Sequence, residues 1–186
     1  MPLTINRLIF DRVKAVIAET GRINMLSWAK VRGSAMAESV DEIRGLSLLD
    51  DCRTTSCIGG LICYLATSEE ITHVAEIYDL SDNEVQEPYI LSAALLLDGA
   101  EDKYELENAC LPLFSLTHWP LAEQSAYGAS QTDMERNQVG LRRMDNWAAA
   151  IEARQSPHDL HILLALSFFS QKNSGWQHRA TNAVGS

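Results

Sequence analysis

The stretch "CRTTSCIGGLICYL", residues 52–65, carries the strongest local signals for the fold of this chain. Two cysteines bracket two threonines, a glycine pair follows at once, and then an apolar run begins. Threonine is a preferred helix N-cap, so Thr54 and Thr55 predict a helix that begins near Cys57. The glycine pair has no side chains, and we expect another segment to pack closely against the backbone there.

The spacing of the cysteines argues against a metal site. A structural zinc ion usually takes four ligands from two close pairs, and the four residues between Cys52 and Cys57 do not form the usual Cys-x-x-Cys unit. Cys63 and Cys110 stand alone on apolar segments, where a free cysteine acts as a small core residue. A disulfide between Cys52 and Cys57 is geometrically possible but would close a very short loop and stabilise little. We expect neither a metal nor another cofactor.

A reactive thiol is the alternative interpretation of the same stretch. In the first turn of a helix, free backbone N–H groups and the helix dipole would lower the pKa of Cys57. Either His73 or His118 would then have to act as the base. No spacing ties either histidine to Cys57. The sequence favours a buried, structural Cys57, with a thiol-dependent enzyme or redox sensor as the alternative function.

The rest of the chain predicts more helices. Apolar residues recur every three or four positions in residues 3–17, and Thr20 precedes a glycine that would end this helix. Ser68 is a candidate N-cap, and Ser81 with Glu84 forms a capping-box pattern. Pro88 suits the first turn of the next helix.

We therefore expect a mainly α fold, a single compact domain of about seven short helices over residues 1–170. Residues 115–130, punctuated by a proline and a glycine, predict a loop. Residues 157–169 predict an apolar helix that follows a Ser-Pro start signal. The polar residues 171–186 predict a frayed tail.

The negative charge is confined to one part of the chain. Residues 68–107 hold twelve acidic residues and one basic residue, Lys103, which gives a net charge of −11 (12 − 1). The whole chain carries −10, so the other 13 acidic and 14 basic residues sum to +1. The candidate partner-binding residues are Glu69, Glu70, Glu76, Asp79, Asp82, Glu84, Glu87, Glu101, Asp102 and Glu105.

This charge distribution limits the kind of partner. Direct binding to nucleic acid needs Lys and Arg at the phosphates, so we expect a basic protein partner, or a second copy of the chain held through residues 157–169. No run of about 18 apolar residues is present, and the N-terminus alternates charged and apolar residues. We expect no membrane association and a cytoplasmic protein.

Three short elements of the chain occur together. They are Met25 and Trp28; Cys52, Thr54, Cys57, Ile58 and Gly60; and Leu113, Phe114, Trp119 and Pro120. In this arrangement, over roughly residues 23–120, the chain resembles a group of small bacterial and phage proteins of unassigned function. Their signature is approximately C-G-T-x-x-C-I-A-G-W, with Met-x-x-Trp upstream and Leu-Phe and Trp-Pro downstream. Arg53, Gly59 and Leu61 depart from it, standing where that group has Gly, Ala and Trp.

The resemblance implies a small helical domain in a phage or mobile-element setting and assigns no activity. With the acidic segment, the sequence predicts a non-enzymatic interaction protein that presents residues 68–107 as an acidic helical surface to a basic protein.

Overall fold

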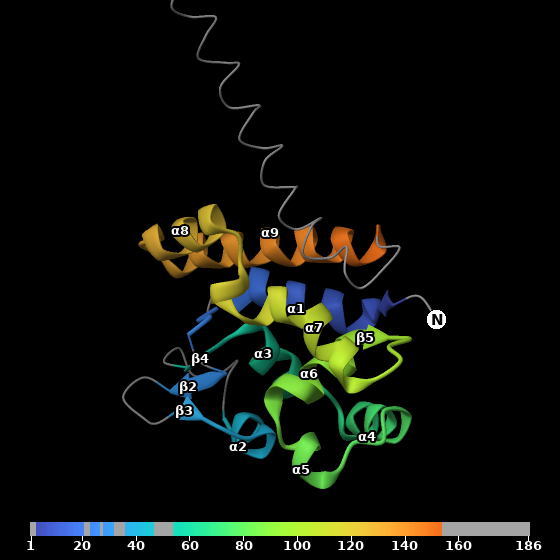
Figure 1. The fold of residues 1–186 in the computed structure, drawn as a ribbon. Helices are drawn as coiled ribbons and strands as arrows, with labels where there is room; N and C mark the ends of the chain where they lie inside the picture. The colour runs from blue at the N-terminus through green and yellow to red at the C-terminus, as the bar shows by residue number, and fades with distance from the viewer. Residues whose placement is uncertain (1–2, 21–22, 27, 32–35, 47–53, 154–186) are drawn as a thin grey trace, which may run out of the picture.

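The computed structural model describes residues 3–20, 23–26, 28–31, 36–46 and 54–153, and the expected helix at 157–169 and the tail lie outside these residues. Figure 1 shows the arrangement of the elements. They are β1 (Thr4–Ile5), α1 (Arg7–Thr20), β2 (Ala29–Val31), β3 (Met36–Ala37), α2 (Val40–Arg44), β4 (Thr54–Ser56), α3 (Ile58–Leu65), α4 (Ser68–Ile77), α5 (Asp82–Val85), α6 (Pro88–Leu96), β5 (Leu97–Asp98), α7 (Lys103–Phe114), the 3₁₀ helix η1 (Leu116–His118), α8 (Leu121–Ala129) and α9 (Asp133–Glu152).

The prediction of a mainly α fold is confirmed. Nine α-helices lie in the described part of the chain, and seven of them have eight or more residues. In Figure 1, α8 and α9 lie across one side of α1, and α2, α4 and α5 lie at the opposite end of the molecule.

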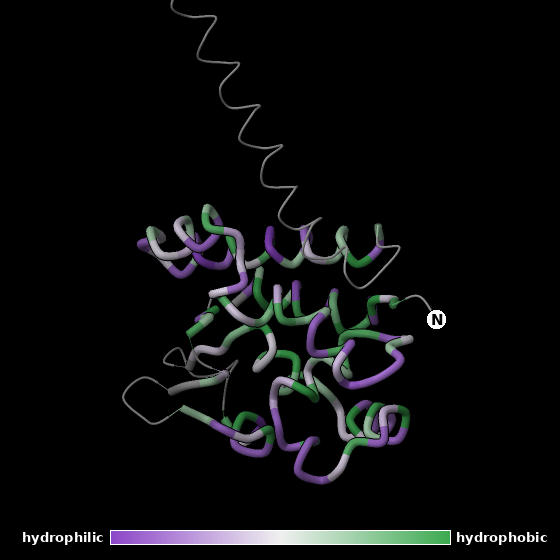
Figure 2. Tube along the Cα trace, in the orientation of Figure 1, coloured by the Kyte–Doolittle hydropathy of each residue, from purple (hydrophilic) through white to green (hydrophobic). Residues whose placement is uncertain are grey.

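Helices α3 and α6 form the centre of the molecule. In α3 the residues from Ile58 to Cys63 are all buried, and in α6 Pro88 and every residue from Ile90 to Leu96 are buried. The two helices pack against each other, and α1, α4 and α7 pack around them. Figure 2 shows this apolar centre in green and mostly polar helices around it. A helix that is apolar on all sides needs such a position, because every face of it must be covered.

The glycine pair allows the close approach that the sequence predicts. A Cβ atom on Gly60 would lie 1.8 Å from the carbonyl oxygen of Trp28, and one on Gly59 would lie 2.5 Å from Cζ3 of the same residue. The backbone of α3 therefore rests directly on Trp28. The Cys57 N–H completes this contact by donating to the Trp28 carbonyl at 3.1 Å.

The residues before α3 form a strand, which the sequence did not predict. β4 pairs with β2, and β2 pairs with β3, both antiparallel, in the order β3-β2-β4. Thr54 and Thr55 belong to β4, so the expectation that they cap α3 is wrong. These strands have two or three residues, too few for an alternating pattern to reveal them.

Pro112 lies in the last turn of α7, and side chains of α9 donate hydrogen bonds to two carbonyl groups of this part of the helix. The last four carbonyl groups of a helix have no partner within it, and the Pro112 carbonyl is one of these. The buried Arg143 side chain donates from Nε to the Pro112 carbonyl at 2.8 Å. Trp147 donates from Nε1 to the Ala109 carbonyl at 2.7 Å. Helices α7 and α9 are thereby joined directly.

Residues 115–130 do not form the predicted loop. They contain η1, which packs on α7, and α8, which packs beside α9 (Figure 1). Trp119 is buried and donates from Nε1 to the Leu113 carbonyl at 3.1 Å. Tyr127 is also buried and packs edge to face against Trp119, with ring centroids 5.7 Å apart. Contacts with distant residues, rather than a local apolar pattern, explain this helix.

Candidate functional site

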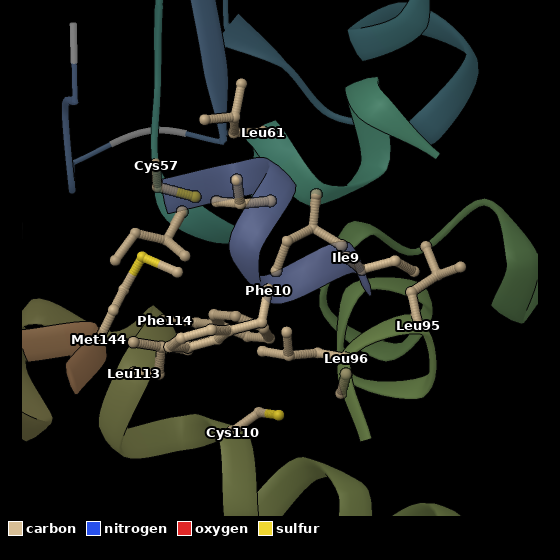
Figure 3. Packing of buried hydrophobic residues seen from close by; sticks show 14 of the residues in the cluster. Ile9, Phe10, Cys57, Leu61, Leu95, Leu96, Cys110, Leu113, Phe114 and Met144 are labelled. Atoms are coloured by element: carbon tan, nitrogen blue, oxygen red, sulfur yellow. The ribbon is translucent and has the colours of Figure 1, made fainter. Parts of the chain in front are cut away.

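Cys57 is the N-cap of α3 rather than a residue of its first turn. Its Sγ accepts a hydrogen bond from the Gly60 N–H at 3.3 Å. The side chain is 4% exposed and belongs to the apolar cluster shown in Figure 3. A cysteine thus does here what serine or threonine usually does at the start of a helix.

The surroundings of Cys57 disfavour a thiolate. Burial raises the pKa of Cys57 to about 12 and outweighs the opposing hydrogen bond from Gly60. The lowered pKa that a reactive thiol requires is therefore not found. Cys52 and Arg53 lie outside the described residues, and so does the possible disulfide between Cys52 and Cys57.

Neither candidate base is hydrogen-bonded to Cys57 in the described part of the chain. His73 is exposed on α4, and His118 is exposed at the end of η1. The Nδ1 atom of His118 lies 3.0 Å from Ser115 Oγ and 3.2 Å from Thr117 Oγ1. Within the described ranges, no hydrogen bond links either imidazole to the Cys57 thiol. The geometry gives no support to thiol catalysis.

Two of the ten candidate carboxylates hold the fold together through ion pairs. Glu70 accepts from both terminal nitrogens of Arg12, at 3.0 and 3.1 Å, and from the Thr67 N–H at 2.8 Å. The hydrogen bonds from Arg12 are the main reason that the pKa of Glu70 lies below its usual value. Glu84 accepts from Lys103 Nζ at 2.7 Å, which lowers the pKa of Glu84 to about 2.

Two more carboxylates serve the start of α7. Asp102 is its N-cap and accepts from the Glu105 N–H at 2.8 Å. Glu105 accepts in turn from the Glu101 N–H at 2.8 Å. Asp102 thereby satisfies a backbone donor that the first turn of the helix leaves unpaired, and Glu105 satisfies the N–H just before the N-cap. Glu101 itself is exposed beside them. A partner would have to compete with existing hydrogen bonds to reach Asp102 or Glu105.

The other candidate carboxylates, and one that the sequence did not single out, face solvent. Each is exposed, and its side chain has neither a hydrogen bond nor an ion pair to any residue in the described part of the chain. They come from α2, α4, α5 and the turns beside them, and we call this set the acidic end. Its members are Asp41, Glu69, Glu76, Asp79, Asp82 and Glu87.

The fold gathers these carboxylates around α6. Both α4 and α5 pack on α6, and they lie at the same end of the molecule in Figure 1. The ion pair between Lys103 and Glu84 joins the start of α7 to α5, and Arg12 joins α1 to α4. Arg12 and Lys103 are thus already paired with carboxylates of the fold.

The sequence missed the contribution of α2. Its first residue, Val40, donates its N–H to the Gln86 carbonyl at 3.1 Å, and the Asp41 N–H donates to Gln86 Oε1 at 3.2 Å. These bonds place Asp41 and the exposed Glu42 beside α5. The local signal was Ser39, which caps α2 ahead of two acids in the first turn, but a single turn is easily taken for a loop.

The described residues contain no group of three or more His, Cys, Asp or Glu side chains placed to hold a metal ion. Among the helices that the structure describes, none combines the length and the apolar character needed to cross a membrane. Comparison of the chain with known protein families, with curated proteins and with solved structures found no match.

Proposed function

We propose that this chain is a non-enzymatic interaction protein whose acidic end binds a basic protein partner in the cytoplasm. The observation that carries the proposal is the set of six exposed carboxylates on α2, α4, α5 and the turns beside them, which have no partner in the described part of the chain. A phage or mobile-element setting, which the sequence resemblance implies, remains a prediction.

Physical chemistry supports a cationic partner for such a surface. Like charges held close together repel one another, and a partner that supplies Lys and Arg relieves this repulsion. Exposed carboxylates keep much of their hydration in such a complex, so complementarity mainly speeds association and selects the partner. The interaction should therefore weaken as salt rises, because ions screen exposed charges.

The test removes charge without removing a hydrogen bond of the fold. The triple variant Glu76→Gln, Asp79→Asn, Glu87→Gln takes three charges from the acidic end. Asp79 has a positive φ of 48°, and asparagine tolerates that conformation. We expect the wild-type chain to capture a basic protein from host lysate at low salt and to lose it at high salt. The triple variant should capture much less of the same protein at low salt.

A matched control removes three charges from the opposite side of the molecule. Asp133, Asp145 and Glu152 lie on α9, with side chains 61%, 58% and 53% exposed, each in an exposed ion pair. Such pairs contribute at most about 1 kcal/mol, so neutralising these residues should preserve the fold. This control should retain the partner. Equal loss in both triple variants would contradict a localised binding surface, and so would capture that does not depend on salt.

The other expected partner is a second copy of the chain, held through residues 157–169, which lie outside the described residues. Sedimentation of the wild-type chain and of the acidic-end variant distinguishes the two kinds of partner. Self-association through residues 157–169 should be the same in both proteins.

A further inference from the structure

Ile23 and Asn24 lie against the outer side of β4, and the chain turns at Met25 and Leu26. The Asn24 N–H donates to the Ser56 carbonyl at 2.8 Å, and Ile23 forms a parallel bridge with Ser56 in β4. Successive residues of an extended chain direct their backbone groups to opposite sides. The N–H and C=O groups of Ile23 and the N–H of Met25 point away from β4, towards Asn137 and Tyr127.

Side chains from two helices cover this edge. The Tyr127 hydroxyl, from α8, donates to the Ile23 carbonyl at 3.2 Å and accepts from the Met25 N–H at 2.9 Å. Asn137, from α9, accepts the Ile23 N–H at 3.2 Å through Oδ1. One hydroxyl thus takes the place of a neighbouring strand. Burial raises the pKa of Tyr127, so the hydroxyl stays protonated at neutral pH and can both donate and accept.

Helix α8, which carries Tyr127, has little apolar contact of its own. In residues 116–129 the buried side chains are those of Trp119 and Tyr127, and Leu121 is 78% exposed. The other main attachments of α8 are polar, since Glu123 accepts from Asn146 Nδ2 at 2.9 Å and from Arg143 Nη1 at 3.4 Å. Segments with few buried apolar side chains open locally at a lower free-energy cost than the core.

The chain before and after α8 is held independently of it. Helices α7 and α9 are joined directly by the hydrogen bonds from Arg143 to Pro112 and from Trp147 to Ala109. The first turn of α9 has its own capping box, formed by Thr132 and Glu135. The segment from η1 to the end of α8 lies outside the interface of α7 and α9. It can therefore detach while both of these helices stay in place.

We propose that η1 and α8 form a strap that opens locally as one unit and thereby uncovers the main-chain edge at Ile23 and Met25. This inference goes beyond the acidic end, which lies at the other end of the molecule (Figure 1). In the open state a backbone acceptor, the Ile23 C=O, and a backbone donor, the Met25 N–H, both lose their partner. Those are the groups with which an added extended peptide pairs, and proteins commonly keep such edges covered.

Residue-resolved native-state hydrogen exchange on the intact chain tests the strap, with denaturant kept below the unfolding transition. We expect the Met25 amide and the amides of residues 125–129 to share one opening equilibrium. The equilibrium constant for this opening should be at least about tenfold larger than the one for residues 92–96 of α6. Exchange of Met25 and α8 only through global unfolding, at the same protection as α6, would overturn the proposal.

A pair of tyrosine variants sharpens the test. Tyr127→Phe keeps the ring and removes the hydroxyl, and it should increase the opening of residues 125–129 about tenfold relative to α6. The matched control, Tyr89→Phe, removes a hydrogen bond of 2.7 Å to the Glu107 carbonyl and should leave α8 unchanged. The Met25 amide loses its own acceptor in Tyr127→Phe, so α8 is the informative region. An increase confined to Met25, or an equal increase throughout the molecule, would contradict a strap that opens as a unit. If Tyr127→Phe fails to fold, the wild-type measurement still decides.

Discussion

The central helices and the acidic helices of this molecule are held in different ways. Nearly every side chain of α3 and α6 is buried, whereas α4 buries Val74 alone and α5 buries none of its residues. The acidic helices bury fewer side chains: α4 packs Ile71 and Val74 on the core, and ion pairs join Arg12 to Glu70 and Lys103 to Glu84. Apolar burial on every side fixes the centre, whereas the acidic helices pack on it by one face and keep their outer carboxylates in water.

This difference in burial determines which side chains can be substituted without disturbing the fold. A buried side chain cannot change without disturbing its neighbours, because protein interiors are close-packed. An exposed carboxylate with no partner in the fold can change at little cost in stability. The exposed carboxylates of the acidic end can therefore be substituted while the fold stays the same.

The largest expected effect is at the contact of α3 with Trp28. Gly60→Ala places a methyl group 1.8 Å from a backbone oxygen, which no side-chain rotation can relieve. We expect a loss of more than about 4 kcal/mol in the free energy of unfolding, or no folded protein. Urea denaturation followed by circular dichroism measures it.

The matched control for this glycine is Gly128→Ala in α8, where an added methyl group meets nothing within 4 Å. It should stabilise the protein by about 0.5–1 kcal/mol through helix propensity. Similar small effects of both substitutions would show that α3 does not need its close contact with Trp28.

A second comparison truncates one side chain in each region. Leu95→Ala in α6 removes a fully buried side chain and should cost about 2–5 kcal/mol in the free energy of unfolding. Ile77→Ala in α4 removes a side chain that is 55% exposed and should cost less than about 1 kcal/mol. The two urea midpoints give the comparison directly. Equal losses would mean that the acidic layer is packed as tightly as the centre.

The smallest expected effect concerns pH. The pKa of Glu84 falls from 4.5 to about 2 in the folded protein, mainly because of its hydrogen bond with Lys103. Between these two pH values the unfolded chain binds more protons than the folded chain, so this stabilisation is present above about pH 4.5 and is lost as pH falls towards 2.

Glu84→Gln measures this contribution. The difference in melting temperature between wild type and Glu84→Gln should shrink as pH falls below 4.5. Asp145→Asn, which removes an exposed carboxylate on α9, serves as the control. A wild-type advantage that stays constant down to pH 2 would contradict the lowered pKa.

Local signals in the sequence were enough for several elements. The capping box of Ser81 and Glu84 starts α5, and Pro88 is the first residue of α6, both as predicted. The N-cap of α4 is Thr67 rather than Ser68, a difference of one residue. Such features depend on contacts three or four residues apart, so they can be recognised without knowledge of the fold.

Other elements depend on residues far away in the sequence. Strand β4 exists because β2 lies beside it, and α8 lies where it does because Tyr127 bonds to residues about 100 positions earlier. The burial of Cys57, which raises its pKa, likewise comes from the distant residues that surround it in the apolar core. No local pattern of two to nine residues contains this information.

By itself, the sequence determined that the protein is mainly helical and that its negative charge lies in one segment, because helix signals are local and charge is a property of composition. Only the tertiary structure decided which carboxylates form hydrogen bonds or ion pairs within the fold. It engages Glu70, Glu84, Asp102 and Glu105 in caps and ion pairs, leaves others in solvent, and brings Asp41 to join them through Gln86. The physical reason is that a carboxylate is free or engaged according to the donors that the fold places beside it.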